Sequence, residues 1–242
     1  MKLLAIETAT EACSVALSLD GAIIERHQIA PRRHAELTLP WIDELLAEAG
    51  ISRSQLDVIA CGRGPGAFTG VRLAVAITQG LGFALDRPVV GVSTLHALAL
   101  PVMRELDTRG DTRSGVLAAI DARMGEVYLA RYARDDSGHW QPLGDEQLAA
   151  PAHVPALEHG EWLGVGTGFA AESGALPDAL GSRLIQCDAT ALPRAADVAC
   201  LAAMAFIKGE HTPPEALQPA YLRNKVAFTL REQGKPTPAM PT

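Results

Sequence analysis

A glycine-rich segment, residues 62–70, has the composition of a ligand-binding turn. It reads Gly-Arg-Gly-Pro-Gly-Ala-Phe-Thr-Gly and joins a short apolar run to a helical pattern. Glycines permit tight turns whose N–H groups can hold an anion. The spacing matches neither the P-loop nor the dinucleotide-binding pattern, and no lysine follows Thr69 or Gly70. Two interpretations stay open: a structural turn in which Thr69 caps the next helix, and an anion or ligand contact. The second would use the backbone with Arg63, Gly64, Gly66, Thr69, Gly70 and Arg72.

Two carboxylates, Glu7 and Asp121, end apolar runs that lie 114 residues apart. Carboxylates that face a common cleft could coordinate a metal or orient a water molecule. Alternatively, each could cap its own turn through backbone N–H groups. Another glycine-rich turn, Gly164-Val-Gly166-Thr-Gly168, could lie beside a nucleotide base or simply reverse the chain.

Other chemistry has no support in the sequence. The seven histidines include no pair at helical metal-binding spacing, and Gly91-Val-Ser93-Thr-Leu95 lacks the second glycine of a serine-hydrolase elbow. The four cysteines have no C-x-x-C spacing and are expected to be buried free thiols of a reducing compartment. We therefore predict no catalytic residue and no metal site.

The elements that must position these residues follow from the hydrophobic pattern. Strands are expected at 2–7, 13–19, 22–28, 57–61, 89–92, 115–121, 126–133 and 162–165. Helices are expected at 34–49, 71–85, 94–105 and 195–208. Because the strand, turn and strand around Glu7 recur around Asp121, we predict two similar lobes, with a boundary in the polar stretch 104–114.

The helix at 71–85 is apolar on nearly every side, so both of its faces must be covered. It could lie at the centre of its own domain, or it could face a partner subunit. Gly80 and Gly82 favour the partner, because glycine inside a helix costs about 1 kcal/mol unless another backbone approaches closely.

Composition limits the class of protein. The chain has 242 residues, 48% hydrophobic and 20% charged, with a formal net charge of -7, which is typical of a globular protein rather than a dedicated nucleic-acid binder. The longest uncharged stretch, 88–103, is too short for a membrane span, and we expect a cytoplasmic protein. The basic residues Arg223, Lys225, Arg231 and Lys235 indicate a solvated terminal helix or an RNA-facing patch.

Five segments resemble the TsaB (YeaZ) family of bacterial tRNA threonylcarbamoyladenosine biosynthesis proteins, within the TsaD and glycoprotease-like superfamily. They are Leu4-Ala-Ile-Glu-Thr-Ala-Thr-Glu-Ala-Cys-Ser-Val-Ala16, Gly64-Pro-Gly-Ala-Phe-Thr-Gly-Val-Arg72, Val92-Ser-Thr-Leu95, Asp121-Ala-Arg-Met-Gly-Glu-Val127 and Pro219-Ala-Tyr-Leu-Arg223. The resemblance implies an α/β fold of the actin-like, Hsp70-like (ASKHA) type, in which each of two lobes is a mixed sheet with flanking helices. We expect one lobe at 1–106, a smaller one at 114–212, a return of about 215–230 to the first lobe, and a disordered tail at 233–242.

The resemblance also implies partners. Proteins of this family pair with a related TsaD-like subunit and, together with a TsaE-like ATPase, modify the adenosine at position 37 of tRNAs that read codons beginning with A. ATP and a metal are expected on the partner subunits, and no cofactor is expected on this chain alone. The chain would form a homodimer when alone, reach tRNA through the complex, and have no membrane contact. The interface implied by the family lies on helices 34–49 and 71–85, at Leu37, Trp41, Leu45, Val71, Leu73, Ala74, Val75, Ile77, Gly80 and Leu81.

Departures from the relatives indicate a subunit without catalysis of its own. Thr94 and Leu98 stand where TsaD-like sequences carry two metal-binding histidines, and Glu7 stands where actin-like nucleotide-binding proteins use aspartate. The nucleotide-cleft turns therefore look degenerate, at Glu7, Thr8, Asp121, Arg123, Gly125, Gly164, Gly166 and Gly168. The alternatives are a glycoprotease-like (M22-type) metallopeptidase and an actin-like small-molecule kinase or ATPase.

Overall fold

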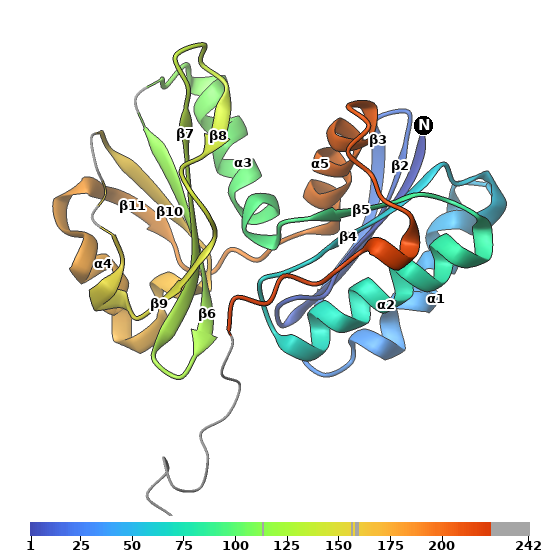
Figure 1. Cartoon of the computed structure of the whole chain (residues 1–242), viewed down its shortest axis with the longest axis horizontal. Coiled ribbons are helices and arrows are strands. Elements are labelled where there is room, and N and C mark those ends of the chain that lie inside the picture. The colour runs from blue at the N-terminus through green and yellow to red at the C-terminus, as the bar shows by residue number, and fades with distance from the viewer. Residues whose placement is uncertain (113, 156, 158–159, 224–242) are drawn as a thin grey trace, which may run out of the picture.

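Two β-sheets form two lobes, seen side by side in Figure 1. The computed structural model describes residues 1–112, 114–155, 157 and 160–223. The first sheet has the strand order β3-β2-β1-β4-β5. The strands β1 to β3 are antiparallel, and β4 and β5 run parallel to β1. The bounds are β1 (Lys2–Glu7), β2 (Ala12–Leu19), β3 (Ala22–Ile29), β4 (Val58–Gly62) and β5 (Val89–Val92).

The second sheet repeats the topology of the first. Its strand order is β11-β10-β6-β7-β8, with β9 paired to β7. The strands β6, β7 and β8 are antiparallel and β10 and β11 run parallel to β6, so β6 takes the place of β1. This confirms the repeat predicted from the 114-residue spacing. The bounds are β6 (Gly115–Arg123), β7 (Glu126–Arg134), β8 (Trp140–Pro142), β9 (Gln147–Ala149), β10 (Trp162–Val165) and β11 (Leu184–Asp188).

Strand alternation gives the first sheet two apolar faces. On β1, Leu4 and Ile6 pack with helices α1 (His34–Glu48) and α2 (Phe68–Leu85), whereas Leu3 and Ala5 pack with α5 (Ala195–Ile207) on the opposite face. The sheet is therefore covered on both sides by helices.

The helix α3 (Thr94–Arg109) lies between the lobes, and here the structure differs from the expected boundaries. Its Leu95, Leu98 and Met103 pack on the second sheet, although the span 1–106 was expected to form the first lobe. In return, α5 packs on the first sheet, although it falls within the expected second lobe of 114–212. The hydrophobic period of a helix predicts that it has an apolar face but not which sheet that face covers.

Most predicted elements are confirmed within a few residues. α2 begins three residues earlier than predicted, at Phe68. The elements that the pattern missed are β8, β9, β11 and α4 (Ala175–Leu180), which are short. β11 has four exposed residues in succession, so it carries no alternating pattern. The predicted tail at 233–242 and the basic residues Lys225, Arg231 and Lys235 lie outside the described residues.

One expectation about the surroundings of the cysteines needs correction. Cys13 and Cys61 are buried free thiols and Cys200 is half-buried, but Cys187 is exposed on β11. Among the described residues, α2 is long and apolar enough, by length and composition, to cross a membrane. Arg72 lies inside this helix, so α2 is not one of the uncharged stretches on which the sequence expectation was based. In the fold, one face of α2 is buried on the first sheet.

Candidate functional site

A cleft of about 990 Å³ lies between the two lobes. The turn after β1, the β6–β7 turn and residues 167–171 after β10 line it, together with the N-terminal end of α2 and residues 220–223. The structure therefore brings together the turns of Glu7, Asp121 and Gly164–Gly168, which the sequence analysis singled out. What these turns can bind depends on whether their polar groups are free.

The carboxylate of Glu7 points into the protein rather than into the cleft. The residue is 1% exposed, its Oε1 accepts a hydrogen bond from Ala9 N (2.7 Å), and its Oε2 accepts one from Thr94 Oγ1 (3.2 Å). Burial raises the pKa of Glu7 from 4.5 to about 7, and the hydrogen bonds from Ala9 and Thr94 only partly oppose that rise. Glu7 thus caps its own turn, the simpler of its two interpretations.

Asp121 lines the cleft but is also occupied by its own turn. Its Oδ1 accepts from Arg123 N (2.7 Å), and its Oδ2 lies 2.7 Å from the Arg123 guanidinium. The backbone N–H of Asp121 donates to Thr167 Oγ1 (3.1 Å). Gly125, with φ +75°, completes the β6–β7 turn. The carboxylate is committed to Arg123 in this arrangement.

The glycines after β10 allow close packing. A Cβ at Gly166, whose φ is +111°, would lie 2.3 Å from Ala119 O, and one at Gly168 would lie 2.7 Å from Ala119 Cβ. The N–H of Gly166 donates to Asp188 O (2.8 Å). A Cβ at Gly164 would meet the ring of Phe169 at 2.4 Å. This turn lies directly against β6, with the Gly166 amide already used.

The glycine-rich segment 62–70 packs against the turn after β1. A Cβ at Gly66 would lie 2.5 Å from Ala9 O, and one at Gly70 would lie 1.9 Å from Thr8 O. The Thr8 hydroxyl donates to Gly70 O (2.7 Å). These contacts give the glycines a structural reason, which is close backbone approach between the two segments.

The N–H groups of this segment also find partners inside the protein. Gly64 N donates to Thr94 Oγ1 (3.2 Å) and Ala67 N donates to Ala9 O (2.7 Å). The residue that precedes α2 is Ala67, and Thr69 is an exposed residue inside the helix. The suggestion that Thr69 caps the helix, one part of the structural interpretation, is therefore wrong. The structural interpretation therefore accounts for the segment, and the anion contact has no support from these two amides.

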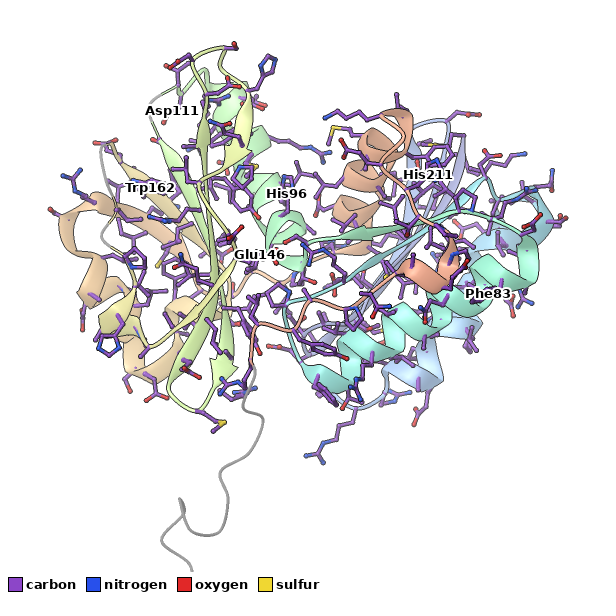
Figure 2. All side chains as sticks on the ribbon, in the orientation of Figure 1. Phe83, His96, Asp111, Glu146, Trp162 and His211 are labelled. Carbon is purple, nitrogen blue, oxygen red and sulfur yellow. The ribbon has the colours of Figure 1, made fainter. Side chains whose placement is uncertain are left out.

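Arg63 and Ser93 connect the lobes away from the cleft. The Ser93 hydroxyl donates to a carboxylate oxygen of Glu146, whose other oxygen lies 3.5 Å from Arg63 Nη2. His96, on the first turn of α3, stacks on Tyr132 with ring centroids 5.0 Å apart. Figure 2 shows His96 and Glu146 between the two sheets. These contacts fix the start of α3 against the second lobe.

A C-terminal strap, residues 217–223, crosses from one lobe to the other. Its first-lobe contacts are Gln79 Nε2 to Leu217 O (3.1 Å) and Ala220 N to Arg63 O (2.7 Å). At its other end Arg223 Nη2 donates to Ala122 O (3.0 Å), and Nη1 lies 2.8 Å from Glu126 Oε2. The sequence signals were the motif Pro219–Arg223 and the expected return of about 215–230 to the first lobe. The contact of Arg223 with the second lobe was not predicted.

The expected interface residues divide by burial. Leu45, Ala74 and Val75 belong to the core beneath the helices, so they are inaccessible to a partner. Val71 is also buried, 2% exposed, and lies at the cleft rather than on the outer surface. Leu37, Trp41, Leu73, Ile77 and Leu81 are half-buried, and Gly80 is exposed. The sequence analysis omitted the exposed apolar residues Leu39, Phe68 and Phe83 of the same helices.

The two glycines of α2 have different explanations. A Cβ at Gly82 would lie 2.7 Å from Pro214 Cγ and 2.8 Å from Val89 Cγ1, so internal packing requires this glycine. A Cβ at Gly80 would meet no atom within 4 Å. The argument for a close-approaching partner therefore applies to Gly80 alone.

Two sheets of identical topology, with a cleft between them and α3 and α5 at their junction, define a two-lobed protein of the actin-like (ASKHA) class. A family model described as "TsaD: tRNA N6-adenosine threonylcarbamoyltransferase" matches residues 26–229. The chain belongs to the TsaB (YeaZ) family of tRNA threonylcarbamoyladenosine biosynthesis proteins.

Individual relatives agree over nearly the whole chain. The TsaB protein of Escherichia coli (strain K12) is 44% identical over 234 residues, which are 94% of this chain and 97% of that protein. The TsaB protein of Haemophilus influenzae is 39% identical over 236 residues, which are 94% of this chain and 96% of that protein. The structure of YeaZ from Pseudomonas aeruginosa matches with a TM-score of 0.80 at 42% identity, covering 91% of this chain and 99% of that one.

Proposed function

We propose that the chain is a non-catalytic subunit in tRNA threonylcarbamoyladenosine synthesis, which binds and activates a TsaD-like threonylcarbamoyltransferase in the cytoplasm. A TsaE-like ATPase completes the system, and ATP and metal are bound by those partners. The match to the TsaD family model supports a shared ancestry with the catalytic subunit. When alone, the chain pairs with a second copy through the same surface.

The environment of Thr94 and Leu98 carries the proposal that the chain is not catalytic. These residues occupy the positions of the two metal-binding histidines in TsaD-like sequences. Thr94 is fully buried and its hydroxyl bonds to Glu7 and to Gly64 N, while Leu98 is 2% exposed in the core beneath α3. Among the described residues, no group of three or more histidine, cysteine, aspartate or glutamate side chains could hold a metal ion. A hydroxyl and a leucine cannot replace two imidazole ligands.

The turns at the cleft support the absence of nucleotide binding by the chain alone. The N–H groups of Ala9, Arg123 and Gly166 donate to protein oxygens at 2.7–2.8 Å. Phosphate turns act through free N–H groups that point at the ligand. A kinase of this fold would need those groups, so we expect no Mg-ATP binding without partners.

The outer face of α2 supports the proposed interface. Ala76, Gly80 and Phe83 share this face, at spacings of four and three residues, and all three are exposed. Leu39, on the other helix that covers this side of the first sheet, is also exposed. Contiguous exposed apolar surface of this kind marks protein interaction sites. Gly80 allows another backbone to approach closely at the centre of this face.

The decisive test is transfer of labelled threonine to tRNA with ATP, bicarbonate, the adenylate-forming enzyme and the TsaD-like and TsaE-like proteins. Incorporation that requires this chain is the expected result, and equal incorporation without it contradicts the activator role. Phe83→Glu, on the outer face of α2, should abolish both capture of the TsaD-like protein and incorporation. Ile207→Glu, at an even more exposed apolar position on α5 (80% against 61%), is the matched control and should retain both.

A further inference from the structure

The mouth of the cleft is locally basic in an acidic chain. Its lining contains two carboxylates, Glu11 and Asp121, and more guanidinium groups than carboxylates, while the whole chain has a formal net charge of -7. The guanidinium groups come from separate segments of both lobes, at Arg32, Arg72, Arg123 and Arg223. Four guanidinium groups against two carboxylates leave the lining with a positive formal charge, and local positive charge attracts anionic ligands. The cleft therefore favours an anion.

An aromatic and guanidinium stack stands at this mouth. The Arg72 guanidinium lies 3.8 Å from the centroid of the Phe68 ring, and its Nε donates to Tyr221 Oη (2.6 Å). The two ring centroids are 5.8 Å apart, and Phe68 and Tyr221 remain 46% and 48% exposed. Stacked rings and guanidinium planes of this kind bind unstacked nucleic-acid bases.

Among the described residues, two of these arginines have no carboxylate partner, although Arg72 Nε already donates to Tyr221 Oη. Within the part of the chain that the structure describes, no carboxylate lies within 4.0 Å of the Arg32 or Arg72 guanidinium. Arg123 is 83% exposed although it contacts Asp121, so one side of its guanidinium faces solvent. The positive charge thus lies on side chains spread along the mouth, whereas the N–H groups of Ala9, Arg123 and Gly166 in the surrounding turns donate to protein oxygens.

We propose that the cleft mouth binds a short single-stranded segment of RNA, with bases stacking on Phe68 and Tyr221 and backbone phosphates pairing with Arg32, Arg72 and Arg123. This rests on the proposed function in tRNA modification, and it adds an RNA contact made by this chain itself. The strap holds Tyr221 in place through Ala220 and Arg223, so the stacking surface is formed before the RNA arrives.

The test uses the full chain and a fluorescein-labelled single-stranded RNA of about ten nucleotides, a length suited to such sites. Anisotropy titrations at several salt concentrations give the affinity and its salt slope. Arg72→Gln should reduce the slope by about 0.7, the value for one phosphate contact on a single strand. Tyr221→Leu should weaken binding about tenfold, as expected for loss of one stacked base. Arg109→Gln, an equally charge-removing change at the exposed end of α3, should leave both unchanged.

Photo-crosslinking of the same RNA carrying 4-thiouridine locates the contact. Adducts within residues 31–34, 63–72, 121–125 or 217–223 support the proposal. Adducts elsewhere, absence of binding at low salt, or a slope that Arg72→Gln does not change would overturn it. Full displacement of the RNA by AMP or ATP at equal affinity would make this a free-nucleotide site. A Tyr221→Leu protein that binds the RNA normally but no longer captures the TsaD-like protein would make it a protein interface. Either result overturns the RNA assignment.

These outcomes are separable from the failure of the proposed function, because the binding test contains no partner protein. Threonine incorporation that needs the chain, combined with no RNA binding, rejects the RNA contact alone. Incorporation that does not need the chain rejects the activator role. Thermal unfolding of each variant shows whether a lost signal reflects a lost fold.

Discussion

Replacement of Glu7 by glutamine should change how stability depends on pH. The carboxyl is buried, and burial raises its pKa from 4.5 to about 7. The folded protein therefore holds this proton more tightly than the unfolded chain does. Between pH 4.5 and pH 7 the folded state binds more protons, so the free energy of unfolding must fall as pH rises through this range. The stabilising contribution is fully present below pH 4.5 and is lost above pH 7.

The magnitude follows from the two pKa values. A tenfold change in proton affinity is worth about 1.4 kcal/mol, so the rise from 4.5 to about 7 corresponds to about 3 kcal/mol. Glu7→Gln keeps an acceptor for Ala9 N and never ionises. Its amide must then donate to the Thr94 hydroxyl, a rearrangement that costs about 1 kcal/mol at every pH. Between pH 4 and pH 8 the natural protein should thus lose about 3 kcal/mol more stability than the variant.

Urea unfolding of both proteins at pH 4, 5, 6, 7 and 8 measures this difference. Other groups with altered pKa values, such as Asp197, whose pKa burial raises to about 6, are present in both proteins and cancel in the comparison. A difference between the two proteins that is the same at pH 4 and pH 8 would refute the reasoning, since it would mean that Glu7 titrates alike in the folded and unfolded states.

Three further predictions follow from the packing. Gly80→Ala should raise the free energy of unfolding by about 0.5 to 1 kcal/mol in dilute protein, because its Cβ meets no atom within 4 Å; a lower midpoint of thermal unfolding would contradict this. Gly62→Ala should lower the free energy of unfolding by about 3 kcal/mol or more, because its Cβ would lie 1.8 Å from Glu7 Oε2. An unchanged urea midpoint would contradict this, since it would mean that Glu7 or the segment moves aside without cost. Arg223→Gln should release the end of the strap from Glu126 and speed hydrogen exchange at the Ala220 amide at least tenfold, and equal exchange in both proteins would argue against a fastened strap.

The sequence predicted the structure best where a residue pattern is compatible with only one kind of secondary-structure element. Alternation in residues 2–7 and its return 114 residues later led to β1, β6 and the two-lobed fold, because a strand with a buried face must alternate. The turn-capping interpretation of Glu7 and Asp121 could also be proposed from the sequence, because each carboxylate bonds to a backbone N–H only two residues away. Exposed residues in β11 gave no period, and that strand was missed.

Features that depend on distant contacts could not be predicted. Gly80 and Gly82 look alike in sequence, yet only the proximity of Pro214 and Val89 distinguishes them. Val75 and Phe83 are both apolar residues of one helix, but the position of the sheet decides that Val75 is core and Phe83 surface. The cluster of Phe68, Arg72 and Tyr221 joins residues 149 positions apart, and no local pattern could reveal it.

The exchanged positions of α3 and α5 constrain how the protein can be made. During synthesis, β1 to β5 leave the ribosome long before α5, so the face of the first sheet that carries Leu3, Ala5, Val58 and Ala60 stays incompletely covered until residues 195–207 emerge. The first lobe cannot complete its core while the chain is still being made, and α3 cannot complete its own packing until β6, β7 and β10 follow it. A cut at the polar stretch near residue 110 would therefore leave two fragments, each with a sheet that lacks one of its helices. The two lobes are consequently one folding unit, although the strands of the first sheet all precede those of the second in the sequence.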